Sequence, residues 1–273
     1  MAIFYLDGDF KDETDAVISI QDLSVLRGYG VFDYLRTYNK KPFRMDSHIK
    51  RFKRSAELTL LNFPWSDDEI KSIVNETLSR NDFPDSNVRL VVTGGESIDS
   101  LTPGDDSKLV VLVTELKPQP SNWYVDGVKI ITSKTERYLP EAKSTNYLNA
   151  IIVLREAKKR DAIESIYVDR NSRVLEGTTS NLFFVKGDRI VTPGDGILSG
   201  VTREVILESY KCFEIEVRDV IYDELGDMDE AFLTSSNKEV VPVIQIDEIV
   251  ISDVPGKITL DVMDFFRKVT ENY

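Results

Sequence analysis

A lysine placed among small and neutral residues is the first candidate for chemistry in this sequence. Lys143 lies in the segment EAKSTNY, with Ser144 and Thr145 directly behind it and an apolar helical pattern beyond. Desolvation among neutral groups lowers the pKa of an ammonium group, and the resulting amine can form a Schiff base with a carbonyl compound. The ordinary alternative is a surface lysine at the start of a helix, because the chain has 34 basic residues.

One carboxylate and two donor-rich turns further along the chain could complete such a site. Glu176 ends a strand-like run and precedes a row of hydroxyl residues at 178–180. Residues 200–202 begin a predicted helix, whose first N–H groups and positive dipole end suit a phosphate. Residues 235–237 follow another strand pattern and again offer donors for an anion. Each feature is weak alone, because hydroxyl-rich turns usually cap structure.

Composition and charge argue against several other classes of protein. The net charge of -13 repels phosphate backbones, so we expect no nucleic-acid partner. The one histidine, His48, and the one cysteine, Cys212, cannot build a Cys/His zinc site, and we expect no metal. A Ser-His-Asp triad would rest wholly on His48, with no nucleophile-elbow motif to support it. We expect His48 to be structural and Cys212 to lie in the apolar core.

The expected compartment is the cytoplasm. The N-terminal residues acquire acids too early for a signal peptide, and no apolar run approaches 18 residues, so we expect no membrane partner. A single cysteine also allows no internal disulfide, which fits a reducing compartment.

The elements that must position the candidate residues fall into two groups. In the first group, the apolar spacing predicts helices with the N-cap residues Ser47 and Ser66, and the second helix also has acids in its first turn. The predicted elements of this group are strands at 2–8, 16–20, 88–95 and 108–116, a hairpin at 30–45, and helices at 47–61 and 66–81.

A stretch with two prolines, residues 117–122, is the best candidate for a linker. Beyond it we predict strands at 127–133, 165–169, 173–177, 181–193, 230–236 and 240–251, and helices at 147–162, 200–211 and 258–272. The chain is therefore predicted to be α+β, with a small domain at 1–116 and a larger domain at 123–273.

Six segments taken together resemble the class IV, or fold-type IV, aminotransferases that use pyridoxal 5'-phosphate. They come in family order and span nearly the whole chain: RGYGVFDYLRTY, SHIKRFKRSA, EAKSTNYLNAI, VLEGTTSNLFFVK, LSGVTREVIL and EAFLTSSNKEVVPV. The resemblance implies a small N-terminal α/β domain and a larger, β-barrel-like C-terminal domain with helices. It also implies a homodimer with sites near the subunit interface.

The resemblance assigns a role to each matched residue. Lys143 would carry the cofactor as a Schiff base and move a proton between Cα and C4', and Glu176 would pair with the pyridine nitrogen. Asp33, where the family commonly has glutamate, has no assigned role. The remaining implied cofactor ligands are Arg51, Val201, Thr202 and Ser236 for the phosphate and Tyr147 for the phenolic oxygen.

Arg51 has three basic neighbours on its predicted helix, Lys50, Lys53 and Arg54. One of them remains an alternative ligand for the phosphate, with Arg51 as a surface residue.

The α-carboxylate of the substrate needs a donor-rich partner, ideally an arginine. Two candidates lie in the small domain, Arg27 and Arg89, and for each an ordinary salt bridge is the alternative. The arginine and histidine typical of D-amino-acid transaminases are replaced by Gly94 and Glu96. Arg89 matches an arginine of branched-chain members, whereas Arg27 is not typical of them and would serve its own or the partner subunit's site.

In the branched-chain members, a different group would hold the carboxylate, namely the turn with Ser235 and Asn237. We predict a transaminase that moves an amino group between an amino acid, with D-amino acids preferred, and a 2-oxo acid such as 2-oxoglutarate. A branched-chain L-amino-acid aminotransferase is the alternative. An aminodeoxychorismate lyase would keep Lys143 and Glu176 but eliminate pyruvate, and a homologue without enzymatic activity is the remaining interpretation.

Overall fold

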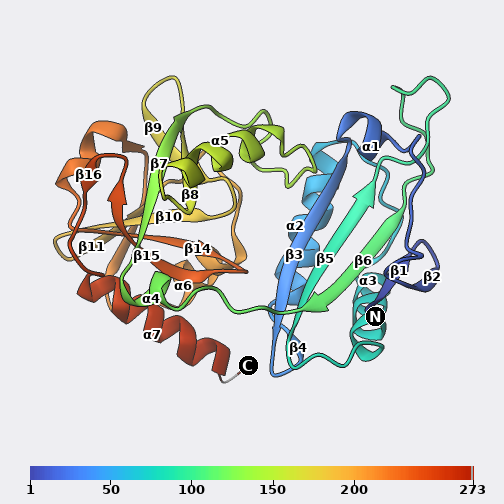
Figure 1. Cartoon of the computed structure of the whole chain (residues 1–273), viewed down its shortest axis with the longest axis horizontal. Helices are drawn as coiled ribbons and strands as arrows, with labels where there is room; N and C mark the ends of the chain where they lie inside the picture. Colours follow the sequence, from blue (N-terminus) through green and yellow to red (C-terminus); the bar gives the residue numbers. More distant parts are fainter. Residues whose placement is uncertain (272) are drawn as a thin grey trace. The chain divides into compact units, whose positions relative to one another are not determined.

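The computed structural model describes residues 1–271 and 273, which cluster into two compact units. Each unit combines helices with a β-sheet, so the chain is α+β, as predicted (Figure 1). The first unit consists of Met1–Lys117, Glu141–Asn146 and Tyr273, and the second of Pro118–Pro140 and the chain from Tyr147 through the last helix. The chain therefore enters the first unit a second time, in the segment that contains Lys143.

The first unit is built on a six-stranded antiparallel sheet in the order β2-β1-β6-β5-β3-β4. Along β3, buried Val31 and Leu35 alternate with the less buried Phe32 and Tyr34, because successive side chains of a strand point to opposite faces. The strands are β1 (Ile3–Leu6), β2 (Asp9–Asp12), β3 (Gly30–Tyr38), β4 (Lys41–Pro42), β5 (Ser86–Thr93) and β6 (Leu109–Glu115).

Three helices belong to this unit: α1 (Leu23–Arg27), α2 (Met45–Leu58) and α3 (Asp67–Ser79). α2 and α3 bury their apolar stripes, which include Phe52 and Val74, in one core with the apolar face of the sheet. This packing holds one face of α2 against β3, and both elements carry candidate site residues.

The second unit is built on a ten-stranded mixed sheet in the order β12-β11-β10-β14-β15-β7-β8-β9-β13, with β16 paired to β15. Its core is lined by apolar residues of the central strands, among them Ile166, Phe184 and Leu233. The strands are β7 (Val128–Lys134), β8 (Glu164–Val168), β9 (Arg173–Gly177), β10 (Asn181–Lys186), β11 (Arg189–Thr192), β12 (Glu214–Val217), β13 (Val220–Ile221), β14 (Glu230–Ser235), β15 (Glu239–Ile246) and β16 (Ile249–Val250).

The helices of the second unit are α4 (Asn122–Val125), α5 (Leu148–Lys159), α6 (Val201–Ser209), the 3-10 helix η1 (Tyr222–Asp227) and α7 (Lys257–Glu271). α7 packs on β14 and β15, and α5 packs on β7 and β8. The closing helix predicted at 258–272 is present, and its last residue lies outside the described residues. In the part of the chain that the structure describes, no helix combines the length and the apolar character needed to cross a bilayer.

Two predicted helix starts have different outcomes. Ser66 caps α3 as predicted, and it forms a capping box with Glu69. The prediction for Ser47 is wrong, because α2 already begins at Met45, after Arg44 in the left-handed conformation. A serine near a helix start is therefore a weak marker when no side-chain bond to the helix N-terminus accompanies it.

Two apolar assignments are also wrong. Residues 16–20 are not a strand: the backbone turns after β2, and Val17 and Ile20 are exposed. Cys212 is exposed rather than part of the core, because it lies in the turn after α6 and not on the helix itself. The periodicity of a short apolar run alone does not show whether the run is a buried strand or an exposed loop.

Candidate active site

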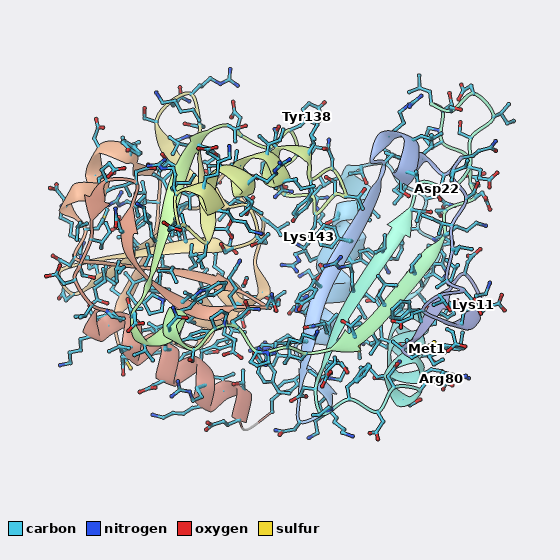
Figure 2. All side chains as sticks on the ribbon, in the orientation of Figure 1. Met1, Lys11, Asp22, Arg80, Tyr138 and Lys143 are labelled. Atoms are coloured by element: carbon cyan, nitrogen blue, oxygen red, sulfur yellow. The ribbon has the colours of Figure 1, made fainter. Side chains whose placement is uncertain are left out.

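Lys143 is held by the sheet of the first unit. Phe32 N–H donates to the Lys143 carbonyl at 2.9 Å, Thr145 N–H donates to the Gly30 carbonyl at 2.9 Å, and Ser144 forms a bridge with Val31. The lysine segment therefore lies beside β3, where Figure 2 shows Lys143. The predicted second domain, 123–273, includes Lys143 by chain order, whereas its backbone contacts place the segment with the first unit.

The Lys143 side chain lies over an aromatic ring that it shares with a candidate substrate ligand. Lys143 Nζ is 4.5 Å from the ring centroid of Phe32, and the Arg89 guanidinium carbon is 5.8 Å from the same centroid. Arg89 is directly opposite Tyr34 in the register of β3 and β5. Two cations that contact one ring can act on one small substrate.

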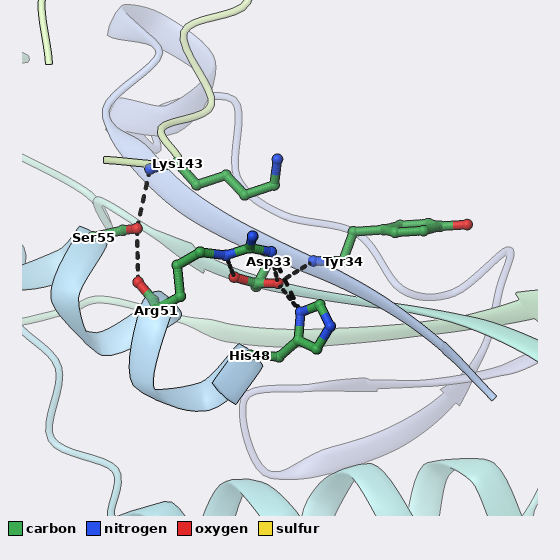
Figure 3. Close-up of polar contacts among 6 residues, drawn as sticks. All are labelled: Asp33, Tyr34, His48, Arg51, Ser55 and Lys143. Carbon is green, nitrogen blue, oxygen red and sulfur yellow. Dashed lines mark hydrogen bonds and ion pairs between the residues drawn. The ribbon is translucent and has the colours of Figure 1, made fainter. Parts of the chain in front are cut away.

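A buried carboxylate on β3 organises the start of α2 (Figure 3). Asp33 accepts hydrogen bonds from Arg51 Nε and Nη2, both at 2.8 Å, and from His48 Nδ1 at 2.7 Å. Burial alone would raise the pKa of the Asp33 carboxyl, but Arg51 and His48 outweigh it and lower that pKa well below its usual range. Asp33 is therefore an ionised carboxylate, and its fork-shaped pairing orients Arg51.

The cluster distinguishes Arg51 from its basic neighbours. The Arg51 side chain is 10% exposed and points to Asp33 at the base of β3, whereas that of Arg54 is 57% exposed and pairs with Glu57 and Glu141. An arginine held in a fixed orientation loses less side-chain entropy when it binds a phosphate. This geometry supports Arg51, rather than Arg54, as the phosphate ligand.

His48 is buried and bonded to Asp33, which agrees with a structural role. Burial lowers the pKa of His48 below its ordinary value of about 6.5, although Asp33 opposes that shift. At pH values between the lowered pKa of His48 in the folded protein and its pKa in the unfolded chain, the unfolded chain binds more protons than the folded protein. Stability should therefore be complete above about pH 6.5 and should decline as the pH falls below it.

The prediction for His48 is direct to measure because it is the single histidine. Its C2–H resonance in proton NMR should titrate with a midpoint below about 6.5. In urea unfolding, the loss of stability between about pH 7 and pH 5.5 should be smaller in His48→Asn, whose amide can donate to Asp33 as Nδ1 does. A midpoint above about 6.5 would contradict this prediction, because it would show that folding favours the charged imidazolium.

Glu176 ends β9 in the second unit and is nearly buried. Its Oε1 accepts a hydrogen bond from Arg137 Nη1 at 2.7 Å, and its Oε2 accepts one from Leu198 N–H at 2.9 Å. Arg137 also donates to the Pro140 carbonyl at 3.0 Å. These two donors orient the carboxylate, which suits a partner for a protonated ring nitrogen.

The start of α6 has the properties of a phosphate site. The N-cap is Gly200, whose position has no side-chain hydrogen bond to the helix, and Val201 and Thr202 are buried. A Cβ at Gly200 would overlap Asn181 Oδ1, so a larger residue there would require the buried Asn181 side chain to move. A buried helix N-terminus needs an external acceptor for its first N–H groups, and a phosphate supplies one.

The hydroxyl-rich turns of the second unit are joined by a buried carboxylate. Glu164 on β8 accepts hydrogen bonds from Thr179 at 2.7 Å and Ser180 at 3.0 Å, and it pairs with Lys238 Nζ at 3.1 Å. Burial would raise the pKa of Glu164, but Lys238 and the hydroxyls lower it overall. This ion pair connects the turn after Glu176 with the β14–β15 turn that contains the predicted ligands Ser235, Ser236 and Asn237.

The remaining predicted residues lie in separate surroundings. Arg27, at the end of α1, is exposed and donates to the Leu26 carbonyl, whereas Arg89 contacts the aromatic rings of β3. The Gly28 carbonyl, next to Arg27, accepts a hydrogen bond from the Thr145 hydroxyl at 2.9 Å, so α1 adjoins the lysine segment. Tyr147 is the N-cap of α5 in the second unit.

The candidate residues fall into two groups, each assembled within one unit. The first unit brings together Lys143, Arg51 and Arg89 near β3. The second unit contains the oriented carboxylate of Glu176 and a buried helix start with no side-chain cap. It also contains Tyr147, Val201, Thr202, Ser235, Ser236 and Asn237. The chemistry of a lysine, an oriented arginine, a carboxylate and a free helix start suits the aldehyde, phosphate and ring nitrogen of pyridoxal 5'-phosphate.

Four residues that organise these two groups received no predicted role: Asp33, Arg137, Glu164 and Lys238. One of them had a visible signal, because Glu164 is a lone acid before the apolar run SIYV of a buried strand. In the regions that the structure covers, no cluster of three or more His, Cys, Asp or Glu side chains could hold a metal.

Comparison with known proteins supports the same chemistry. A family model described as Amino-transferase class IV matches residues 30–246. The chain is 34% identical to a putative branched-chain-amino-acid aminotransferase of Methanocaldococcus jannaschii, across 97% of this chain and 95% of that protein. It is 33% identical to aminodeoxychorismate lyase of Bacillus subtilis (99% and 95% covered) and 29% identical to D-alanine aminotransferase of Staphylococcus aureus (100% and 99% covered).

The fold is shared with solved structures of the same kind. The branched-chain aminotransferase of the archaeon Thermoproteus uzoniensis, solved with norvaline, superposes with a TM-score of 0.90 at 27% identity, over 99% of this chain and 95% of that one. Another solved branched-chain amino acid aminotransferase with a TM-score of 0.92 contains pyridoxamine 5'-phosphate. The match of the family model over most of the chain, together with this fold, confirms the predicted fold-type IV architecture. The chain belongs to the class IV aminotransferases, and it is an enzyme that uses pyridoxal 5'-phosphate.

Proposed function

We propose that this aminotransferase exchanges amino groups between D-amino acids and a 2-oxo acid such as 2-oxoglutarate. The observation that carries this proposal is the shared contact of Lys143 and Arg89 with the ring of Phe32. In this proposal, Arg89 would bind the substrate carboxylate on the same side of the first unit's sheet as the amine of Lys143.

The chain's own groups would divide the work as follows. Bound pyridoxal 5'-phosphate supplies an aldehyde that takes up the amino group and a ring that withdraws electrons from Cα. Lys143 Nζ holds the cofactor and moves a proton to and from the substrate Cα. Arg51, the α6 start and Ser236 bind the phosphate, Tyr147 contacts the phenolic oxygen, and Glu176 stabilises a protonated ring nitrogen.

The substrate carboxylate would be bound on the β3–β5 face. Arg89 lies opposite Tyr34, and both Arg36 and Arg89 act electrostatically on that tyrosine. Burial raises the pKa of Tyr34 to about 12, so its hydroxyl remains protonated. We include Arg27, from its own or the partner subunit, as a second cation for this carboxylate. We infer that a carboxylate held on this face would present the opposite hand of Cα to Lys143, compared with one held by Ser235 and Asn237.

Two relatives favour alternative activities. The similarity to a putative branched-chain-amino-acid aminotransferase favours the branched-chain alternative. In that alternative, the turn after β14 would hold the substrate carboxylate. The similarity to aminodeoxychorismate lyase supports a lyase that uses the same Lys143 and Glu176. The two alternatives differ in product, because only the lyase releases pyruvate without transferring an amino group.

Kinetics with D-alanine, D-glutamate, L-leucine and L-valine, each with 2-oxoglutarate, test the proposal. The D-substrates should be turned over, and Arg89→Ala should raise their KM at least about tenfold, because it removes a charge-assisted bond to the carboxylate. Arg80→Ala, which removes an arginine paired with Glu76 on α3, is the matched control.

Two outcomes would overturn the proposal. Turnover confined to the L-branched substrates, with Arg27→Ala and Arg89→Ala leaving their KM unchanged, would identify the branched-chain alternative. Pyruvate release from aminodeoxychorismate without amino transfer would identify the lyase.

We also propose that the enzyme is a homodimer. Support comes from Leu148, Ile151 and Ile152, which are large apolar residues exposed on α5 in the single chain. Light scattering of the purified enzyme measures its mass against the 31.1 kDa of one chain.

A further inference from the structure

A single buried hydroxyl connects the backbones of two candidate site residues of the first unit, Lys143 and Arg51. Ser55 on α2 is fully buried, and its Oγ donates to the Arg51 carbonyl at 2.9 Å. The same Oγ accepts the backbone N–H of Lys143 at 3.0 Å, across 88 residues of sequence (Figure 3). The donor and an acceptor site of one side chain are thus used at the same time.

The Lys143 backbone is hydrogen-bonded on both sides of its Cα. The Lys143 carbonyl accepts Phe32 N–H at 2.9 Å, while its N–H donates to Ser55. With both flanking peptide groups held, the direction of the Cα–Cβ bond is set, and the side chain extends from a fixed origin toward the Phe32 ring. Ser55 therefore helps to orient the Lys143 side chain without contacting its amine.

The other end of the connection is also held in place. Arg51 is oriented by the two bonds from its guanidinium to Asp33, and its carbonyl is bonded to Ser55 one turn later. Figure 3 shows the Lys143 and Arg51 side chains extending in the same direction from these anchors. The turn from Arg51 to Ser55 thus relates the phosphate ligand to the lysine that carries the cofactor.

We propose that Ser55 is a positioning residue that fixes Lys143 relative to Arg51. The proposal rests on the roles given above to those two residues. A bound cofactor is held by its phosphate at one end and by the lysine at the other, so an error in their relative position misaligns the reacting carbon. Misplacement by about 1 Å from a residue outside the chemistry can cost up to about a hundredfold in rate.

The competing explanation is ordinary helix structure. Serine and threonine often hydrogen-bond to the carbonyl four residues earlier in a helix. Thr77 on α3 does this with Ile73 at 2.7 Å, and it is also fully buried in the first unit. Since Thr77 belongs to a helix other than the one that bonds the lysine segment, Thr77→Val is a matched control for loss of a buried helical hydroxyl.

The experiment compares Ser55→Ala and Ser55→Cys with Thr77→Val. In the cofactor-free protein, hydrogen exchange of the peptide that contains Lys143 should become at least about tenfold faster in both Ser55 variants, because its amide loses a strong acceptor. In the cofactor-loaded protein, the pH at which the lysine-bound absorbance changes should shift. The value of kcat should fall about tenfold, or roughly 1.4 kcal/mol, with KM for the amino donor within about twofold.

Unchanged exchange at Lys143 and unchanged kcat in the Ser55 variants would overturn the positioning role, and so would an equal loss in Thr77→Val. If the unaltered enzyme shows no lysine-bound absorbance with pyridoxal 5'-phosphate, the assignment of Lys143 itself fails, and this inference fails with it. Ser55→Cys keeps a γ atom in the buried position, whereas Ser55→Ala leaves that space empty. If Ser55→Ala fails to fold, Ser55→Cys therefore still tests the positioning role.

Discussion

Lys143→Ala is expected to lose the visible absorbance of lysine-bound pyridoxal 5'-phosphate and to reduce transamination at least about a thousandfold, or roughly 4 kcal/mol. The amine is both the covalent anchor of the cofactor and the group that moves the Cα proton. No other described lysine is placed over the Phe32 ring as this one is. Single-turnover spectra with each amino donor measure both effects.

The control for this variant is Lys158→Ala, which removes an exposed lysine at the end of α5. It should keep the spectrum and the rate of the unaltered enzyme. Adding methylamine to Lys143→Ala should restore part of the rate if the missing function is proton transfer. Near-normal turnover without any added amine would reject Lys143 as the catalytic residue.

Glu176→Gln is expected to slow Cα proton removal about a hundredfold, or roughly 2.7 kcal/mol. Glutamine keeps the size and one acceptor for Leu198 N–H, but it removes the negative charge that stabilises a protonated ring nitrogen. It also leaves Arg137 without its 2.7 Å carboxylate partner. Stopped-flow measurement of the half-reaction with one amino donor gives this rate.

Cofactor affinity should change less than the rate in Glu176→Gln, because the phosphate contacts remain. Glu156→Gln is the matched control, because it makes the same substitution at an exposed acid paired with Lys159. A half-reaction rate equal to that of the unaltered enzyme would show that another group protonates the ring nitrogen. Equal losses of rate and affinity would instead indicate that Glu176 mainly holds the local fold through Arg137 and Leu198.

Much of the fold could be predicted from local patterns. The apolar period of about 3.6 residues identified α3 and α5, and the N-cap Ser66 with its first-turn acids marked the start of α3. Strands such as β5 and β10 appeared as apolar and β-branched runs bounded by turn residues. Local patterns failed in segments too short for periodicity to distinguish a strand from a loop. Examples are the exposed loop at 16–20 and the two-residue strand β13.

The sequence by itself determined the cofactor chemistry, because Lys143, Glu176 and the α6 start follow one another in segments whose order resembles one family. Only the tertiary structure decided how these residues are held. Ser55 is 88 residues from Lys143 in sequence, and Glu164 is 74 residues from Lys238. Sheet register and helix packing bring such pairs together, and neither distance nor register can be read from spacing along a chain.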